Sequence, residues 1–137
     1  MIKFVLDRHE AIKRGLHWDL RFKLPDSEKW ASFSMNQRPP TELGKRIYVP
    51  RSNDHSEREA LFTGTIAKGA YGAGKIIRED QGDCNVMKHT STHIVVDFKG
   101  KKLKGIYHFI NTSVFSKKKG NYYRNVYAFF KGKINEK

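Results

Sequence analysis

The sequence has little cysteine and no long apolar run, and both absences narrow the classes of protein that fit it. Cys84 is the single cysteine, so no internal disulfide can stabilise the fold, and an intracellular setting is expected. No segment approaches the roughly 18 consecutive apolar residues of a membrane span, and the N-terminus lacks the apolar run of a signal peptide. We therefore expect a soluble intracellular protein that does not bind a membrane.

Acidic residues are scarce relative to basic ones, and this imbalance indicates the kind of partner. The chain has 14 Asp and Glu against 27 Lys and Arg, which gives a formal net charge of +13. Because a surplus of this size concentrates polyanions at the surface, nucleic acid is the expected partner. An anionic membrane and a surface charged for solubility alone are the weaker alternatives.

Amphipathic helical patterns are nearly absent, and short strands separated by turn residues take their place. The length of 137 residues predicts one domain over 1–137, and 2 Trp, 6 Tyr and 9 Phe can supply its core. Helical turns are expected near 10–13 and 56–60, and a polar loop over 51–58. Strands are expected at 2–6, 16–24, 29–33, 47–49, 61–66, 75–78, 93–98, 103–110 and 122–131. This pattern predicts a mainly β fold, a small closed antiparallel β-barrel with short helical turns.

One predicted strand carries an unusual row of polar side chains. Residues 15–22 read G-L-H-W-D-L-R-F, and strand geometry would place His17, Asp19 and Arg21 on one face. His9, from the preceding segment, could reach that face. Two imidazoles and a carboxylate suit Zn²⁺, Mn²⁺ or a similar cation, and a guanidinium beside them suits phosphate. The alternatives are a solvated strand face and a surface salt bridge of Arg21.

A series of motifs in a fixed order resembles the 3′-phosphoesterase domain of bacterial and archaeal ligase D. The motifs are R-H-E-A at 8–11, L-H-W-D-L-R-F at 16–22, K-W-A at 29–31, N-D-H-S at 53–56, F-T-G-T-I-A-K-G-A-Y-G-A-G-K-I at 62–76 and L-K-G-I-Y at 103–107. The resemblance covers about residues 3–110. It leaves 111–137 as a basic, aromatic C-terminal extension, whose aromatic side chains suit either a core or a nucleic-acid-binding rim.

The resemblance implies a metal-dependent phosphoesterase that trims nucleic-acid 3′ ends in DNA repair and end joining. It would remove a 3′-phosphate or a terminal ribonucleotide from DNA or RNA and leave a 3′-OH. It implies Mn²⁺ as the cofactor, with Zn²⁺ or Co²⁺ as alternatives, bound by the catalytic residues His9, His17 and Asp19. Arg21 and His55 match the catalytic positions that contact the phosphate. We expect a monomer that works with a DNA ligase supplied by a separate chain.

The sequence departs from the family pattern around His55. Asn53 stands where the family has an acidic residue, Ser56 replaces a proline and Glu59 replaces a tyrosine. His55 lies in a polar stretch where an exposed loop histidine is the ordinary alternative to a functional one. The interval between His9 and His17 is also two residues longer than the family usually has.

Three further arginines are candidates for contact with phosphate or nucleic acid. The family has a lysine shortly after its W-A motif, and the matching position here lies near Ser34. Arg38 is therefore the candidate replacement for that cation. Arg46 and Arg51 could flank a phosphate, with scaffold or solvent-exposed roles as alternatives. The departures leave two alternatives to an enzyme: a non-catalytic module that binds nucleic-acid ends and recruits or assists a ligase, and a protein that packages RNA through its charge alone.

Overall fold

A computed structural model describes residues 1–112 and 125–133 of the chain. In this part of the chain the single helix is α1 (Glu57–Leu61), and no helix is long and apolar enough to cross a membrane. The strands are β1 (Phe4–Ala11), β2 (Gly15–Lys23), β3 (Trp30–Met35), β4 (Arg46–His55), β5 (Gly64–Ile66), β6 (Gly74–His89), β7 (His93–Lys99), β8 (Lys104–Asn111) and β9 (Val126–Lys131).

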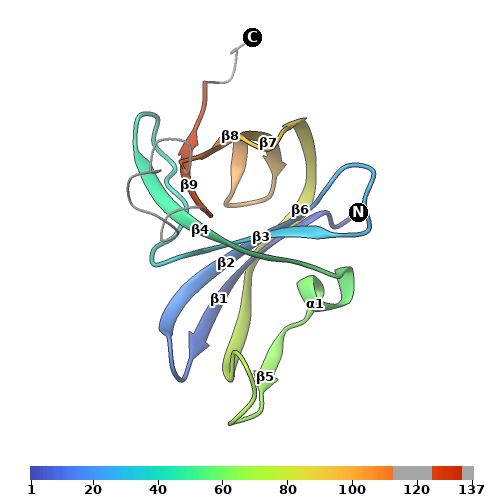
Figure 1. Ribbon diagram of the computed structural model, residues 1–137, viewed down its shortest axis with the longest axis vertical. Helices are drawn as coiled ribbons and strands as arrows, with labels where there is room; N and C mark the ends of the chain where they lie inside the picture. Colours follow the sequence, from blue (N-terminus) through green and yellow to red (C-terminus); the bar gives the residue numbers. More distant parts are fainter. Residues whose placement is uncertain (113–124, 134–137) are drawn as a thin grey trace.

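The strands form one antiparallel sheet that closes on itself (Figure 1). Their order is β1-β2-β3-β4-β9-β8-β7-β6-β5, and β1 also pairs with β6. All strands except β5 therefore complete a barrel-like ring, and β5 is added beside the first residues of β6. This closure confirms the predicted mainly β, closed antiparallel fold.

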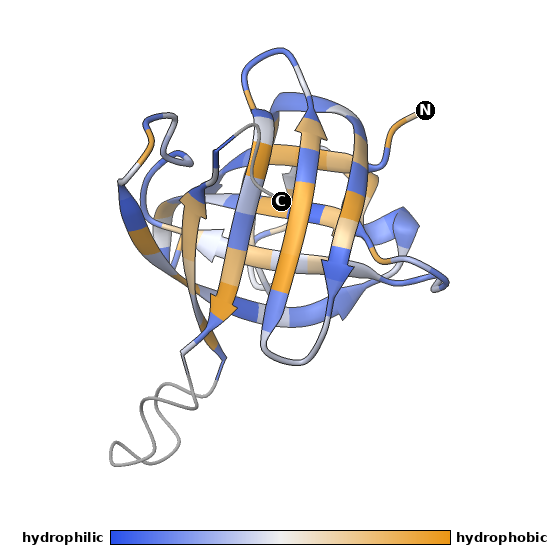
Figure 2. Cartoon of the chain, turned by 90° about the horizontal axis from the view of Figure 1, so that it is seen from above, coloured by the Kyte–Doolittle hydropathy of each residue, from blue (hydrophilic) through white to orange (hydrophobic). Residues whose placement is uncertain are grey.

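Aromatic side chains fill the inside of the ring. Figure 2 shows apolar and polar bands alternating along the strands, as expected for a sheet with one buried face. Trp18, Leu20 and Phe22 form the inward row of β2 and are at most 7% exposed. Phe109 stacks between Phe33 and Phe129, with both centroid separations at 4.5 Å. Because this core fixes the inward face of β2, it also fixes the outward face that carries His17, Asp19 and Arg21.

The strands β1, β4 and β6 are longer than the sequence predicts. The strand expected at 2–6 continues as β1 to Ala11, so His9 lies on a strand. The predicted loop over 51–58 is wrong, because β4 continues to His55 and α1 follows at once. Only 75–78 was expected as strand within β6, which runs to His89. The extensions of β4 and β6 have polar sequences, but their backbones are paired: Ser52 lies opposite Ser32, and Cys84 lies opposite Phe98. Pairing with distant strands therefore sets these lengths.

The connection from β4 to β6 lies over the outer face of the ring. Its helix α1 contacts β2 and β4, and Ala60 on that helix is completely buried. Arg78 on β6 donates from Nη2 to the carbonyl of Leu61 at 3.2 Å and also binds Asp7 on β1. These bonds hold the end of α1 against the strands. The connection therefore covers part of the outward face that the sequence marks as polar.

Candidate metal and phosphate site

The outward rows of β1 and β2 meet side by side. His9 is paired with His17 across the two strands, so their side chains share one face with that of Asp19. Although they point outward from the ring, His9, His17 and Asp19 are only 6%, 4% and 5% exposed. The connection between β4 and β6 reaches His9, since the Gly72 carbonyl lies 2.8 Å from its Nε2. The solvated strand face, one of the two alternatives, is therefore excluded.

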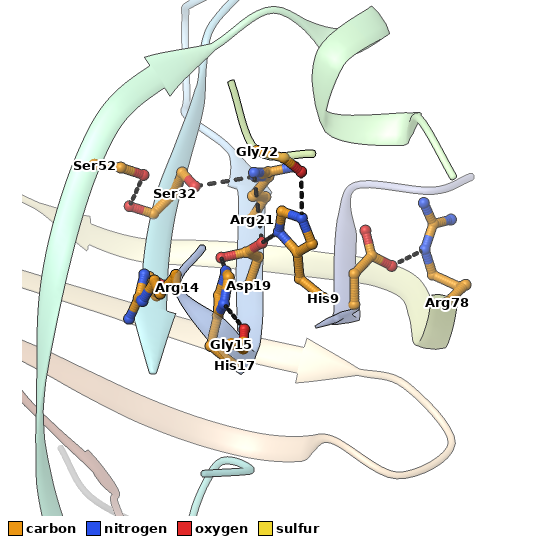
Figure 3. A network of polar contacts seen from close by, with 12 residues as sticks. His9, Arg14, Gly15, His17, Asp19, Arg21, Ser32, Ser52, Gly72 and Arg78 are labelled. Carbon is orange, nitrogen blue, oxygen red and sulfur yellow. Dashed lines mark hydrogen bonds and ion pairs between the residues drawn. The ribbon is translucent and has the colours of Figure 1, made fainter. Parts of the chain in front are cut away.

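These three side chains converge on one point (Figure 3). His9 Nδ1 lies 3.2 Å from Asp19 Oδ2, and His17 Nε2 lies 3.4 Å from Asp19 Oδ1. One ligating atom from each residue lies within 4.8 Å of the other two. Within residues 1–112 and 125–133, this is the only group of three or more such side chains that could hold a metal ion.

Two backbone carbonyls fix which nitrogen of each imidazole faces Asp19. His9 donates from Nε2 to the Gly72 carbonyl at 2.8 Å, and His17 donates from Nδ1 to the Gly15 carbonyl at 3.1 Å. Because a carbonyl can only accept, the remaining nitrogen of each neutral ring turns a lone pair toward the carboxylate. Hydrogen-bond acceptors that face one another need a proton or a metal cation between them. Imidazoles held from behind by carbonyls are also typical of metal ligands, so these residues fit a divalent cation.

The electrostatics of the cluster favour a negative carboxylate. Burial alone raises the pKa of Asp19, but its contacts with the His17 and His9 imidazoles and the charge of Arg21 together lower it well below its usual value. The pKa of His9 is raised, chiefly by its hydrogen bond with Asp19. A proton and a metal cation therefore compete for the same lone pair of His9.

Arg21 lies beside the cluster and is held by the neighbouring strand. Its Nε donates to Ser32 Oγ at 3.0 Å, and its Nη2 is 3.8 Å from Asp19 Oδ2. The Ser32 carbonyl accepts in turn from Ser52 Oγ at 3.3 Å, so β2, β3 and β4 are linked across the outward face (Figure 3). The Arg21 side chain is partly buried rather than exposed, with 12% of it accessible. The surface salt bridge is therefore excluded for Arg21.

His55 ends β4 on the same side of the ring. It is paired with Trp30, and its Nδ1 is buried without a hydrogen-bond partner. Burial, followed by the charge of Arg21, lowers its pKa and thus favours the neutral imidazole. Arg21 is thus close enough to act on His55 electrostatically, and the exposed loop histidine is excluded.

Two of the departures from the family pattern have a local structural role. Ser56 accepts from the backbone N–H of Glu59, and the Glu59 carboxylate accepts from the backbone N–H of Ser56 at 2.9 Å. This reciprocal capping box begins α1 directly after His55. The serine and glutamate therefore fix the chain at the point where His55 leaves the sheet.

The structure does not bring the three other predicted arginines to the cluster. Arg38 binds Glu79 through two hydrogen bonds and lies over the inward-facing Trp18, on the opposite face of the sheet. Arg51 also faces inward, donates to Tyr127 Oη at 3.2 Å and pairs with Asp54. Arg46 shares the outward face but lies at the far end of β4.

Sequence reasoning missed two contributors to the site. Arg14, in the turn between β1 and β2, donates to Ser34 Oγ, and Ser34 lies opposite Asp19 on β3. A cation therefore does reach the Ser34 position, but from Arg14 rather than Arg38. The lengthened interval between His9 and His17 is the signal that could have directed attention to this turn. The Gly72 carbonyl left no such signal in the glycine motif.

Comparison with known proteins finds similarity over the part of the chain that contains these residues. The model of the DNA ligase D 3′-phosphoesterase domain matches residues 7–111. The multifunctional non-homologous end joining protein LigD of Mycolicibacterium smegmatis is 31% identical over 121 residues, covering 80% of this chain and 15% of that protein. The protein of the same name from Pseudomonas aeruginosa is 27% identical over 119 residues, covering 83% of this chain and 14% of that protein.

The extent of these matches decides the classification. The chain spans about one seventh of the length of the curated relatives it matches, so the similarity concerns one region of much longer proteins. Within this chain the family match includes every residue of the cluster and its neighbours Arg21 and His55. The chain belongs to the DNA ligase D 3′-phosphoesterase domain family.

Proposed function

We propose that this protein is a metal-dependent phosphoesterase that trims nucleic-acid 3′ ends during DNA repair by end joining. The observation that carries the proposal is the convergence of His9, His17 and Asp19 beside the partly buried guanidinium of Arg21. Family membership supplies the reaction class, a hydrolase that acts on phosphate esters. Trimming would remove a 3′-phosphate or a terminal ribonucleotide and leave the 3′-OH that a ligase needs.

The cluster would hold one divalent cation through His9 Nδ1, His17 Nε2 and a carboxylate oxygen of Asp19. When bound, such a cation supplies Lewis-acid chemistry toward a phosphoryl oxygen. Imidazole and carboxylate ligands together suit Mn²⁺, and also Zn²⁺ or Co²⁺. The carbonyls of Gly15 and Gly72 keep both imidazoles in the ligating tautomer, so the protein is organised for the cation before it binds.

Arg21 and His55 would act on the phosphate from the other side. In hydrolysis of a 3′-phosphate, a water oxygen bonds to phosphorus, the bond from phosphorus to the 3′ oxygen breaks, and that oxygen takes up a proton. Arg21 would balance the charge that develops on the phosphoryl oxygens. His55, once protonated, would donate to the departing 3′ oxygen. A bound phosphate favours this protonation because its negative charge opposes the effect of Arg21 on the pKa of His55.

The test uses a labelled single strand ending in a 3′-phosphate, incubated with Mn²⁺ or with a chelator. We expect conversion to a 3′-OH that depends on metal, and loss of both metal uptake and product in His17→Ala and Asp19→Ala. His89→Ala is the matched control, because His89 is exposed at the end of β6. Full activity of either cluster variant, or equal activity with chelator present, would contradict the assignment.

The second candidate function is a non-catalytic module that binds nucleic-acid ends and assists a ligase. One observation favours it: the ligating side chains are almost completely buried, with Asp19 only 5% exposed. This candidate predicts salt-sensitive binding of the labelled strand and no product at any enzyme concentration. The same assay therefore separates the two functions. A charge-only packaging protein would bind equally well in the wild-type and Asp19→Ala forms.

A further inference from the structure

The outward face of β4 leads away from the candidate site to the opposite end of the sheet. Its outward row is Arg46, Tyr48, Pro50 and Ser52, all exposed. Ser52 is hydrogen-bonded to Ser32, which in turn holds Arg21. Figure 1 shows β4 running from the neighbourhood of β9 to α1. At a rise of about 3.3 Å per residue, the row is ~20 Å long.

The far end of this row is a stack of flat side chains. The Arg46 guanidinium lies over the Phe130 ring at 4.6 Å from its centroid. Phe130 stacks on His108 at 5.2 Å, with 8° between the ring planes. The stack fixes the plane of an exposed guanidinium, and such a plane is a platform on which a nucleobase can stack. Tyr48, two residues along β4, is 61% exposed, which is unusual for so large a ring.

A cavity of about 470 Å³ opens beside this stack. Its walls include Leu43, Arg46, Phe130, Lys131 and Lys133. Among its described lining residues three are cationic and none is acidic. An apolar wall next to several cations is complementary to a ligand that combines flat bases with phosphates.

We propose that the outward face of β4, from Ser52 to the cavity at Arg46, binds the single strand whose 3′ end lies at the candidate site. This inference rests on the proposed function, because that function places the 3′ end beside Arg21. The bases stack on Tyr48 and on the Arg46 guanidinium, and Lys131 and Lys133 attract the phosphates upstream. Stacking on a side chain requires an unpaired base, so the surface selects single strands over duplex.

The test measures kcat/KM for two substrates that end in a 3′-phosphate, a dinucleotide and a long single strand. The dinucleotide is too short to reach Arg46. The ratio of kcat/KM for the long strand to kcat/KM for the dinucleotide therefore reports the surface alone. We expect Tyr48→Ala and Arg46→Ala each to lower this ratio roughly tenfold, in line with the loss of one stacked base. Arg46→Lys, which keeps the charge and loses the plane, should lower it nearly as far.

Lys88→Ala is the matched control, since it removes the same charge from an exposed position on β6, across the ring. Fluorescence anisotropy with the same long strand and with a blunt duplex gives a second readout that needs no turnover. Length-dependent binding that is sensitive to Arg46 in a protein without product supports the surface and rejects the proposed function. Turnover with an unchanged ratio in both variants, or an equal loss of duplex and single-strand binding, overturns the surface.

Discussion

Gly72 offers a direct test of whether a backbone carbonyl positions His9 in the candidate metal site. Its φ is +76°, in the left-handed region, and a Cβ added there would lie 3.6 Å from His9 Cε1 and 3.8 Å from Ile66 Cδ1. Both distances are ordinary contacts, so Gly72→Ala introduces no clash. The whole effect comes from the left-handed backbone, which costs a residue with a Cβ about 1–2 kcal/mol.

The turn can relieve this strain only by rotating the backbone at Gly72. That rotation moves the carbonyl away from His9 Nε2, which now lies 2.8 Å away. Loss of an outer hydrogen bond to a metal ligand typically lowers metal affinity about 10–100-fold. We therefore expect Gly72→Ala to bind Mn²⁺ that much more weakly in isothermal titration calorimetry, with a free energy of unfolding lower by about 1–2 kcal/mol.

Gly69→Ala separates strain from ligand positioning. Gly69 has φ +93° in the same turn, and an added Cβ meets nothing within 4 Å. The two variants should lose similar stability in thermal melts, while Gly69→Ala keeps wild-type Mn²⁺ affinity. Equal losses of affinity in both variants would show that turn strain alone matters. No loss in Gly72→Ala would refute the idea that the carbonyl holds His9.

Three further predictions concern His55, Arg14 and Asp80. Burial and Arg21 lower the pKa of His55, so general-acid action predicts that kcat/KM falls as pH rises through a value below about 6.5. His55→Gln should remove this fall in kcat/KM, and a fall that persists in the variant contradicts the role. Arg14→Ala should lower kcat/KM about tenfold, on the order of one charge-assisted contact, whereas Lys13→Ala in the same turn should not, and equal effects would reject the Arg14 contact. Burial raises the pKa of Asp80, but hydrogen bonds from the backbone N–H groups of Leu103, Lys102 and Lys101 outweigh it and lower the pKa, so this carboxylate stabilises the fold above its unfolded pKa of about 3.9 and the effect is lost as pH falls through the lower folded value. Asp80→Asn should cost about 2 kcal/mol at neutral pH and little in acid by urea denaturation, and a pH-independent difference would contradict this.

The part of the site that the sequence predicted follows from local geometry. Alternation in β2 places His17, Asp19 and Arg21 on one face because the opposite row must fill an aromatic core. The hairpin from β1 to β2 then brings His9 directly opposite His17. Both relations depend on neighbouring segments, and both can be derived from strand periodicity and a short turn.

What the sequence could not predict depends on contacts between distant segments. The Gly72 carbonyl reaches His9 across 63 positions, and burial of the outward face depends on where the connection between β4 and β6 comes to lie. The loop prediction at 51–58 failed for the same reason, since pairing with β3 makes those polar residues a strand. Backbone carbonyls and cross-ring pairing carry no residue-type signal, so only three-dimensional structure reveals them.

The two faces of the sheet have different roles: the inward face carries the aromatic core that stabilises the fold, and the outward face carries the candidate site. Inside the ring, aromatic packing sets the register of β1 and β2. Outside it, that register brings two imidazoles and a carboxylate together, and the Gly15 and Gly72 carbonyls orient the imidazoles. A large-to-small change of an inward residue such as Phe22 therefore alters the site only by shifting the strands. A change of Asp19 leaves the aromatic core intact. The connection over the outward face contributes to the burial of the cluster, because its Gly72 carbonyl contacts His9, which is only 6% exposed. Selection for activity can thus act on the covering connection and on β4 without disturbing the core that holds the ligands in register.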